Sequence, residues 1–507
     1  MKKTALFSLF TLEKVEKFAR NLIKAGWDII ASRETVEYLS RKGIAVTDIA
    51  DFTGVRENYG FPPTLHPKVE HYVTSTKGKK RIDLVYVINY PLSVGNDIGG
   101  RTLLALAAKG RRIPVMSVAD MEMVVNELKK YGKLSENLHL QLLDKTNAQI
   151  SSHFFDLVKE RKSFEAIFGE FKYPLKNGEN PYQIPAELFS THNSDNLSLS
   201  NFKQISGESP CFTNLADSDS IIQTLSLCGE AFRKHYKKVP YICIAAKHGN
   251  PCGMAVDWND PAVAIKNALF GNPRAIWGGE VITNFKIDER NAKLLIRSKK
   301  RKELIGDYAW MLDIVIAPCF TRKAIDILGK RRQRKLFENP ELFFPFVTQL
   351  RWSYRFVRGG FLRQPPHNYI LNLKDADFIG EELEGCSIDS LIIAWATAYS
   401  SNLGGNEIAI AKDRSLISCG GGSATIDAVQ SAIFKAKNLG HSLHGGVFAA
   451  DSFFPFIDAP QLLAEAGITA GVVPSGGKAI KDVKTFFEDN HISIFYLPEQ
   501  FRGFCRH

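Results

Sequence analysis

The chain has 507 residues, more than one hydrophobic core usually serves, so we expect two or three domains. Hydrophobic residues make up 45% and charged residues 23%, as in soluble globular proteins, and no run approaches the roughly 20 apolar residues that cross a bilayer. The net charge of +11 is compatible with nucleic acid or an anionic small ligand. The densest basic runs, 299–302 and 330–335, contain no aromatic residues, so we interpret both as solvated helix faces and expect no nucleic-acid partner.

Eight cysteines are scattered along the chain without a CxxC pair or a cluster with histidine. This usage predicts reduced thiols in a cytoplasmic protein, with no structural zinc or other bound metal. The basic and apolar start is followed at once by charged residues from Glu13 to Lys17, so we expect neither a signal peptide nor a membrane partner.

The pattern of residues 1–120 predicts one α/β domain. Short apolar runs predict strands at 5–9, 27–31, 82–88 and 114–118. Apolar residues at helical spacing predict helices at 12–24, 35–41 and 97–108. This alternation indicates a parallel sheet with helices on both faces, whose ligands bind at the carboxyl ends of the strands. Residues 121–163 follow a helical pattern and are expected to connect this domain to the next.

A second α/β region is expected from 164 to 507, and its blocks 241–285 and 407–451 suggest two similar halves. In the first block, the apolar run Tyr241 to Ala246 predicts a buried strand that leads into a loop beginning with Lys247 and His248. Adjacent lysine and histidine offer an acid and a base that burial can bring toward neutral pH. Taken alone, the pair fits an ordinary strand end better, with a solvated lysine and a hydrogen-bonded histidine.

Five further motifs each admit a structural and a functional interpretation. The loop 176–183 is dense in hydrogen-bonding groups, and 212–217 places an amide three residues before a carboxylate, as in a helix cap or a ligand site. An acid leads the apolar strand 313–318. The glycines of 420–423 predict a flexible loop whose amides could meet an anion, without a dinucleotide or ATP pattern. In 451–458, phenylalanines around a proline could form a slot for a flat ligand or simply pack in the core.

Taken together and in order, the motifs resemble the bifunctional purine biosynthesis family, which joins AICAR transformylase to IMP cyclohydrolase. The matching segments extend over nearly the whole chain: 64–67, 89–91, 97–109, 176–183, 214–217, 247–253, 277–279, 313–318, Asn406, 451–458, 474–477 and Arg506-His507. The resemblance implies an α/β fold, with a methylglyoxal-synthase-like doubly wound parallel sheet followed by paired cytidine-deaminase-like subdomains without zinc. It also implies a homodimer with the transformylase site between subunits.

The resemblance implies that the 5-amino group of AICAR attacks the formyl carbon of the co-substrate 10-formyltetrahydrofolate. His248 would take the amine proton, and Lys247 would support proton delivery to the leaving folate nitrogen. Asn406 would help to hold the formyl group, and Phe453 and Asp458 would flank the folate or AICAR ring. The remaining residues that would bind these substrates are Lys176, Asn177, Gly178, Asn214, Asp313 and His507.

In the first domain, Tyr90, Asp97 and Lys109 match the family's cyclohydrolase residues, which would close the ring of the formylated product. The family's catalytic lysine is replaced by Pro63, which can supply neither a cation nor a proton. The phosphate turn Ser-Gly-Gly-Thr is replaced by Ser32-Arg-Glu-Thr35, whose long side chains block close approach of the backbone. The family's Ser-Asp-Lys-Thr is also lost, at 10–13. We therefore expect an impaired cyclohydrolase.

The second domain keeps Lys247 and His248 but departs from the family around the phosphate. Lys176 replaces an arginine and loses its bidentate grip, and Ile426 replaces a second arginine. The leading hypothesis is a formyltransferase acting on AICAR. The alternatives are a divergent formyltransferase acting on another aromatic amine and a non-catalytic paralogue that binds purine intermediates.

Overall fold

The structure is a computed structural model that describes all residues except 1, 56–63, 76–80, 160–163, 192–193 and 506–507. The chain forms two compact units, Met1–Phe168 and Gly169–His507. No helix in the described part of the chain is long and apolar enough to cross a membrane.

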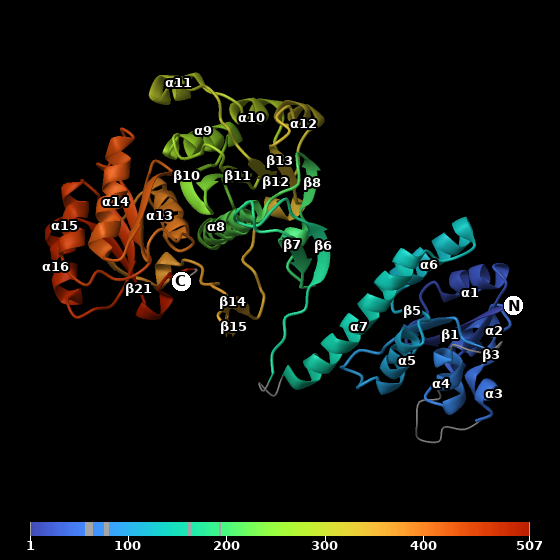
Figure 1. Ribbon diagram of the computed structural model, residues 1–507. Coiled ribbons are helices and arrows are strands. Elements are labelled where there is room, and N and C mark those ends of the chain that lie inside the picture. Colours follow the sequence, from blue (N-terminus) through green and yellow to red (C-terminus); the bar gives the residue numbers. More distant parts are fainter. Residues whose placement is uncertain (1, 56–63, 76–80, 160–163, 192–193, 506–507) are drawn as a thin grey trace. The chain divides into compact units, whose positions relative to one another are not determined.

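Unit 1 is built on a five-stranded sheet in the order β3-β2-β1-β4-β5 (Figure 1). All four strand pairs are parallel. The strands are β1 (Lys3–Leu9), β2 (Trp27–Ala31), β3 (Thr47–Asp48), β4 (Leu84–Ile88) and β5 (Ile113–Val115). The chain winds in opposite directions from β1, so a crevice is expected beyond the carboxyl ends of β1 and β4.

Helices cover both faces of this sheet, as the sequence predicts. One apolar core joins one face to α1 (Val15–Lys24), α2 (Arg33–Arg41), α6 (Val118–Tyr131) and α7 (Glu136–Lys159). The second core joins the other face to α3 (Ile49–Thr53), α4 (Pro67–Thr74) and α5 (Ile98–Lys109).

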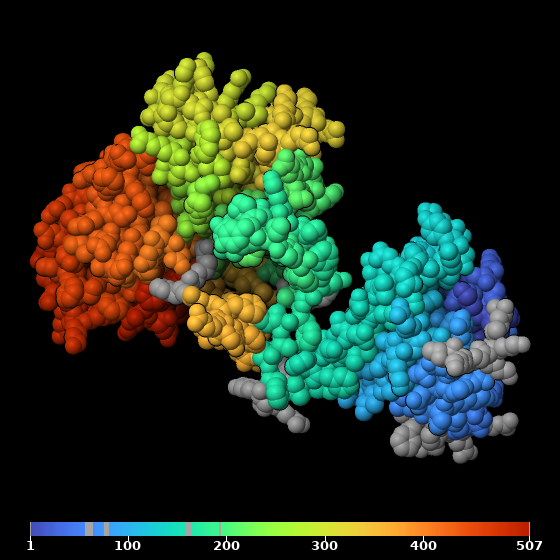
Figure 2. Space-filling view, viewed as in Figure 1, coloured from blue at the N-terminus to red at the C-terminus, as the bar shows by residue number. Residues whose placement is uncertain are grey.

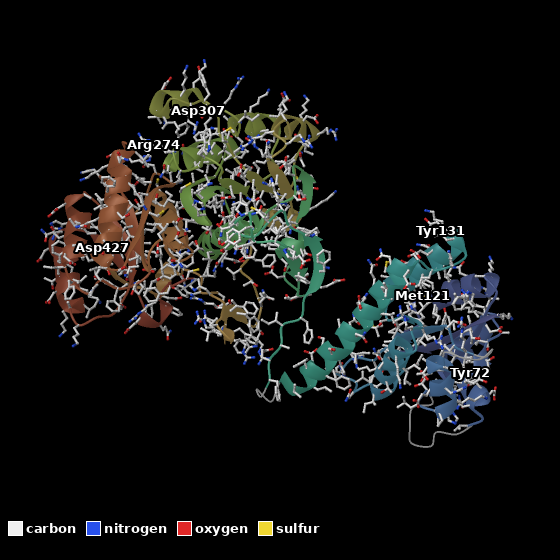
Figure 3. The ribbon with its side chains drawn as sticks, in the orientation of Figure 1. Tyr72, Met121, Tyr131, Arg274, Asp307 and Asp427 are labelled. Carbon is white, nitrogen blue, oxygen red and sulfur yellow. The ribbon has the colours of Figure 1, made fainter. Side chains whose placement is uncertain are left out.

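The helical pattern after residue 120 forms two helices, because Gly132 has a positive φ of 68° and ends α6. Met121, near the start of α6, is buried in the core, whereas Tyr131 at its end is exposed (Figure 3). The predicted strand 114–118 is wrong at its end, since the hydroxyl of Ser117 accepts a hydrogen bond from the Asp120 amide and begins α6.

Unit 2 is built on a mixed sheet of twelve strands in the order β16-β21-β20-β19-β17-β18-β10-β9-β11-β12-β13-β8. One half contains β8 (Lys203–Ser206), β9 (Tyr241–Lys247), β10 (Asn250–Asp257), β11 (Glu280–Thr283), β12 (Ile314–Ala317) and β13 (Lys335–Glu338). The other contains β16 (Asp377–Ile379), β17 (Asn406–Lys412), β18 (Ser415–Gly422), β19 (Val447–Ala450), β20 (Ala470–Pro474) and β21 (Ser493–Leu497). Two separate hairpins pair β6 (Glu170–Pro174) with β7 (Glu187–Ser190) and β14 (Ser353–Val357) with β15 (Gly360–Gln364).

The two halves have the same strand connections, which confirms the similar halves predicted from the sequence. In each half an antiparallel hairpin, β9–β10 or β17–β18, is followed by an antiparallel neighbour and then by two parallel strands. An antiparallel edge strand completes each half, and β10 and β18 join the halves at the centre.

Helices also sandwich this larger sheet. The helices α8 (Phe212–Tyr236) and α13 (Gly385–Ala398) share one apolar core with one face. The opposite face packs against helices of both halves, in two further cores (Figure 1). These helices are α9 (Pro261–Gly271), α10 (Glu289–Leu294), α12 (Arg322–Leu328), α14 (Thr425–Asn438), α15 (Asp458–Glu465) and α16 (Ile480–Asp489).

The predicted flexible glycine loop at 420–423 is wrong, because Gly420 to Gly422 form the end of β18. A Cβ atom on Gly420 would lie 2.2 Å from the Ala428 carbonyl oxygen and 2.5 Å from the Ala432 nitrogen. The glycines therefore let β18 and α14 pack closely, so local flexibility is not their role.

The interpretation of both basic runs as solvated helix faces is also wrong in part. The first run forms α11 (Lys299–Ile305), but Arg301 is buried over the ring of Trp310 and pairs with Asp307 at 3.0 Å (Figure 3 labels Asp307). The second run lies in a turn and β13, where buried Arg334 donates to three backbone carbonyls. These arginines hold loops together through hydrogen bonds to the backbone.

Candidate active site

The Lys247-His248 pair lies at a tight hairpin, not in the longer loop that the sequence suggests. His248 and Gly249 alone connect β9 to β10, and both have positive φ angles, 53° and 67°. Two such residues form the turn type that matches the twist of paired strands. Lys247 ends β9 and is half-buried, whereas the His248 side chain is exposed at the tip. The turn therefore presents an imidazole beside a partly shielded ammonium.

The ammonium of Lys247 is held beside the loop that precedes β11. Its Nζ donates a 2.6 Å hydrogen bond to the carbonyl oxygen of Gly278. A Cβ atom on Gly278 would lie 3.1 Å from this Nζ and 3.6 Å from Oδ2 of Asp313. Because Gly278 has a φ of 67° and carries no side chain, the lysine and the carboxylate can both approach the same point.

Asp313 precedes β12, at the same edge of the sheet as the end of β9. Its Oδ1 forms a 3.1 Å ion pair with Nη2 of Arg331, whose Nη1 donates to the Leu312 carbonyl oxygen. One acidic neighbour of Lys247 is therefore already balanced by a second cation.

Glu280 is a buried acid that the sequence interpretation missed. It begins β11, pairs with Ala246 across the ladder and is 1% exposed. Burial, above all, raises its pKa to about 8, with a further contribution from Asp217 and an opposing one from Lys247. The sequence did contain a signal for Glu280: it is an acid directly before an apolar strand, the same pattern that drew attention to Asp313.

The second half provides an internal comparison for this cluster. The strand register aligns Ala246–Glu280 with Ala411–Val447, so Lys412 is the counterpart of Lys247. Lys412 also ends its strand and donates from Nζ to a backbone carbonyl, that of His444, at 2.7 Å. The counterparts of the two acids are uncharged, as follows from the register: Val447 for Glu280 and Thr469 for Asp313. Only the first half therefore surrounds its lysine with carboxylates at these positions.

A chain of hydrogen bonds connects the His248 turn to the segment that precedes Asn406. Asn250 donates to the His248 carbonyl oxygen at 3.0 Å and accepts from the Asn402 amide at 2.8 Å. Oε1 of Glu407 then accepts from the amides of residues 403–405 at 2.6, 3.0 and 3.3 Å. The network joins the two halves at the sheet edge that carries His248.

Asn406 begins β17, and its Nδ2 donates to the carbonyl oxygens of Gly422 and Ser423 at 3.1 and 3.0 Å. The next residue, Glu407, donates its amide to Oδ1 of buried Asp451 at 3.0 Å. Burial raises the pKa of Asp451 to about 7, and the neighbouring Glu407 carboxylate adds to this rise. Burial likewise raises the pKa of Glu407. Two buried acids, Glu407 and Asp451, are therefore joined by a hydrogen bond directly after Asn406 in the chain.

The predicted nucleotide-pocket residues of the 176–178 loop lie beside the start of α8. The Asn177 carbonyl accepts from the Phe212 amide at 2.9 Å, and Gly178 bonds Gln183 within the loop. Asn214 accepts from the Cys211 amide at 3.2 Å and so caps α8, which is the structural interpretation of this motif. Lys176 is exposed, and its Nζ lies 3.4 Å from Oε2 of Glu208.

The three phenylalanines of 451–458 enter different environments. Phe454 is buried in the core, and Phe456 is exposed. Phe453 is half-buried, with the Arg502 guanidinium 4.6 Å from its ring centre. Asp458 is exposed at the first position of α15. His507 lies outside the described residues.

In unit 1, Tyr90 and Asp97 come together beyond the carboxyl end of β4. Asp97 is buried and accepts from the Gly100 amide at 2.8 Å, and the Tyr90 hydroxyl donates to the Asn96 carbonyl oxygen at 3.2 Å. Lys109 ends the same helix that Asp97 begins, about 18 Å along its axis. The fold of one chain therefore does not bring Lys109 to the Tyr90–Asp97 end. Pro63 lies outside the described residues.

The described residues contain no group of three or more histidine, cysteine or acidic side chains that could hold a metal ion. All eight cysteines are free thiols, and burial raises the pKa of Cys252, next to the candidate site. The site itself offers groups suited to acid–base chemistry: an imidazole, an ammonium and two nearby carboxyl groups.

The chain is similar in sequence to a known family and to several known proteins. A family model described as "AICARFT/IMPCHase bienzyme" matches residues 108–435. The bifunctional purine biosynthesis protein PurH of Caldicellulosiruptor saccharolyticus is 29% identical over 550 residues, covering 99% of this chain and all of that protein. PurH of Aquifex aeolicus is 28% identical over 532 residues, covering 97% and 98% of the two chains. A solved structure described as "Crystal structure of ForH" is 26% identical and covers 32% of this chain and 98% of its own, with a TM-score of 0.29.

Proposed function

The chain belongs to the AICARFT/IMPCHase bienzyme family, and we propose from this that unit 2 transfers the formyl group of 10-formyltetrahydrofolate to the 5-amino group of AICAR. One observation carries the proposal. Lys247 and His248 are consecutive at the tip of a two-residue hairpin, with the ammonium anchored to the Gly278 carbonyl beside Asp313. A cation and a neutral base at fixed neighbouring positions are what two opposite proton transfers require.

His248 takes the proton that the amine loses as its nitrogen bonds to the formyl carbon. Lys247 gives a proton to the folate nitrogen as the bond between that nitrogen and the formyl carbon breaks. Asp313, which lies beside the anchored end of Lys247, is itself paired with Arg331 at 3.1 Å, so its charge is shared between two cations. Asn406 has its Nδ2 engaged with two carbonyls, so its Oδ1 is the atom that meets the substrate.

The direct test follows tetrahydrofolate release when the protein is incubated with AICAR and 10-formyltetrahydrofolate. Release that depends on both substrates supports the proposal. Nucleotide binding without release would instead favour the non-catalytic paralogue and would overturn formyl transfer.

A second candidate, the same transfer to an aromatic amine without a phosphate, is favoured by one observation. Lys176, which replaces an arginine of the family, is exposed and paired with the carboxylate of Glu208. A phosphate would have to compete with that carboxylate for one lysine. Comparing kcat/KM for AICAR and for its dephosphorylated riboside separates the candidates: a preference for AICAR of tenfold or more supports the first.

For unit 1, we propose a slow IMP cyclohydrolase. Arg33 and Glu34 begin α2 at the carboxyl end of β2, both exposed, and Arg33 pairs with Glu37 rather than leaving the helix start open. Glu34 places a negative charge in the first turn, where a phosphate would otherwise be favoured. Supplying formylated AICAR and measuring IMP tests this. Turnover as fast as the formyl transfer would overturn it.

We also propose that unit 1 resembles methylglyoxal synthase, that the two halves of unit 2 resemble cytidine deaminases and that the protein is a homodimer. The duplicated strand order supports the second point. The β14–β15 hairpin supports the third, because Phe356 and Leu362 are 74% and 60% exposed on it (Figure 2, yellow-orange). The register places Phe356 and Leu362 on opposite faces of the hairpin, so a partner subunit that enclosed the hairpin would cover both. Sedimentation equilibrium of the wild-type protein and of a Phe356→Ser, Leu362→Ser variant tests the dimer.

A further inference from the structure

The sequence predicts that residues 121–163 only connect two domains, yet α7 in this segment also reaches the loop that carries Tyr90 and Asp97. Nε2 of His153, on α7, lies 3.0 Å from Oδ1 of Asn96. Because an amide oxygen can only accept, the imidazole donates this hydrogen bond from Nε2. His153 is 5% exposed, whereas Asn96 is exposed. A buried side chain of α7 is therefore bonded to an exposed residue of this loop.

The same asparagine holds Tyr90. The Tyr90 hydroxyl donates to the Asn96 carbonyl oxygen at 3.2 Å, and the Tyr90 amide donates to Oδ2 of Asp97 at 3.4 Å. Asp97 is buried, and its Oδ1 accepts from the Gly100 amide at 2.8 Å in the first turn of α5. Hydrogen bonds thus lead without a gap from His153 through Asn96 to Tyr90.

The rest of the loop has little packing of its own. Residues 91–94, which precede Asn96 in the loop, are exposed. Segments with few buried contacts open more readily than packed ones, so an anchor to a packed element has a large effect on them. The helix α7 is such an element, because Ile150 packs against the apolar core that contains Leu103 and Leu104 of α5. His153, three residues after Ile150, therefore ties the loop to a packed helix.

We propose that His153 is a positioning residue for the site in unit 1: its hydrogen bond to Asn96 fixes the loop and thereby keeps the Tyr90 hydroxyl beside Asp97. The catalytic meaning of this role rests on the proposed ring closure by unit 1. His153 acts through Asn96 and not on the substrate. The helix α7 then belongs to the site and not only to the connection between the two units.

A second histidine of α7 provides a matched control. Nε2 of His139 lies 3.0 Å from the carbonyl oxygen of Arg112, which follows the end of α5. The two histidines are about 21 Å apart along the axis of α7. Each is hydrogen-bonded to an oxygen atom of a neighbouring loop, but His139 is bonded to the loop at the far end of α5 from Asp97. A general effect of losing such a bond should therefore appear in both variants, and an effect on the site only at His153.

The first experiment needs no substrate. Hydrogen–deuterium exchange followed by mass spectrometry reports how readily each segment of the full chain opens. His153→Leu removes the donor but keeps an apolar body, and it should speed exchange in peptides that cover 89–100 by about fivefold or more. His139→Leu should leave those peptides unchanged and speed exchange at 110–113 instead. Faster exchange throughout unit 1 in His153→Leu would indicate a general loss of packing and would overturn the proposal.

The second experiment measures kcat for the conversion of formylated AICAR to IMP. His153→Leu should lower kcat by about tenfold or more, because a small displacement of groups that act on the substrate is costly. His153→Gln places an amide donor near the position of Nε2 and should restore most of the lost rate. His139→Leu should keep the wild-type kcat. If His153→Gln is as slow as His153→Leu, the hydrogen bond to Asn96 is not the cause and the proposal fails.

The two experiments separate this inference from the proposed function. If the wild type forms no IMP, the proposed ring closure fails, yet the exchange pattern still decides whether His153 fixes the loop. Unchanged exchange at 89–100 in His153→Leu would overturn the inference, whatever the rate of ring closure.

Discussion

Lys247 and Lys412 occupy the same position in the two halves of the large sheet. Each ends the first strand of a hairpin, each is followed by two residues with positive φ, and each donates from Nζ to a carbonyl oxygen, at 2.6 and 2.7 Å. They differ in their neighbours, because Lys247 lies near the carboxyl groups of Asp313 and Glu280 and is followed by a histidine. A lysine at this position is therefore common to both halves of the fold. The nearby carboxyl groups and the following histidine are present only in the first half, and these are the features that a function has to explain.

Replacing Lys247 by alanine should abolish measurable formyl transfer, since removing a proton donor of this kind typically lowers the rate by about 10²–10⁴. His248→Ala should have an effect of similar size. Lys412→Ala loses the same backbone hydrogen bond and should keep wild-type kcat. Tetrahydrofolate release measures the activity of all three variants. A comparable loss of activity in Lys412→Ala would contradict the prediction, because losing the hydrogen bond to the backbone would then be enough to explain the effect of Lys247→Ala.

Glu407 should be needed to hold residues 403–405 through its three backbone hydrogen bonds. Glu407→Ala leaves these amides without their acceptor and should destabilise the protein by about 2 kcal/mol or more. Glu407→Gln retains a carbonyl oxygen in the same place and should recover most of that loss. Urea unfolding measures the stability, and KM for folate reports whether the Asn406 segment has moved.

Glu280→Val should stabilise unit 2, and the gain should increase with pH. The folded pKa of Glu280, about 8, lies above the value of about 4.3 in an unfolded chain. Its contribution to stability is therefore fully present below about pH 4.3 and is lost as the pH rises through 8, by up to about 1.4 kcal/mol per pH unit. Urea unfolding at pH 5, 7 and 9 should show this slope in the wild type and a flatter one in the variant. Parallel slopes would contradict it.

Lys176→Arg should improve AICAR binding if the phosphate is part of the substrate. An arginine can grip a phosphate with two parallel hydrogen bonds, and a gain of about 1.4 kcal/mol corresponds to a tenfold lower KM. The dephosphorylated riboside is the control, because its KM should not change. An equal effect on both substrates would indicate that Lys176 does not contact the phosphate.

The sequence alone was sufficient for much of unit 1. It predicted β2 at its observed bounds and found α1, α5 and the parallel sheet, because apolar periodicity is a local property of the chain. It missed β3, a strand of two residues, which is too short to produce a pattern. It also predicted a loop at Gly420 to Gly422, where the glycines serve close packing between β18 and α14.

For the candidate site, the sequence supplied Lys247, His248, Asp313 and Asn406 as residues of interest. Only the tertiary structure brought Glu280 to Lys247, because their proximity depends on the register between β9 and β11. The same register, repeated in the second half, identified Lys412 and Val447 as counterparts. Hydrophobic patterns specify which residues are buried, whereas the neighbours of a charge depend on strand pairing between segments far apart in the chain.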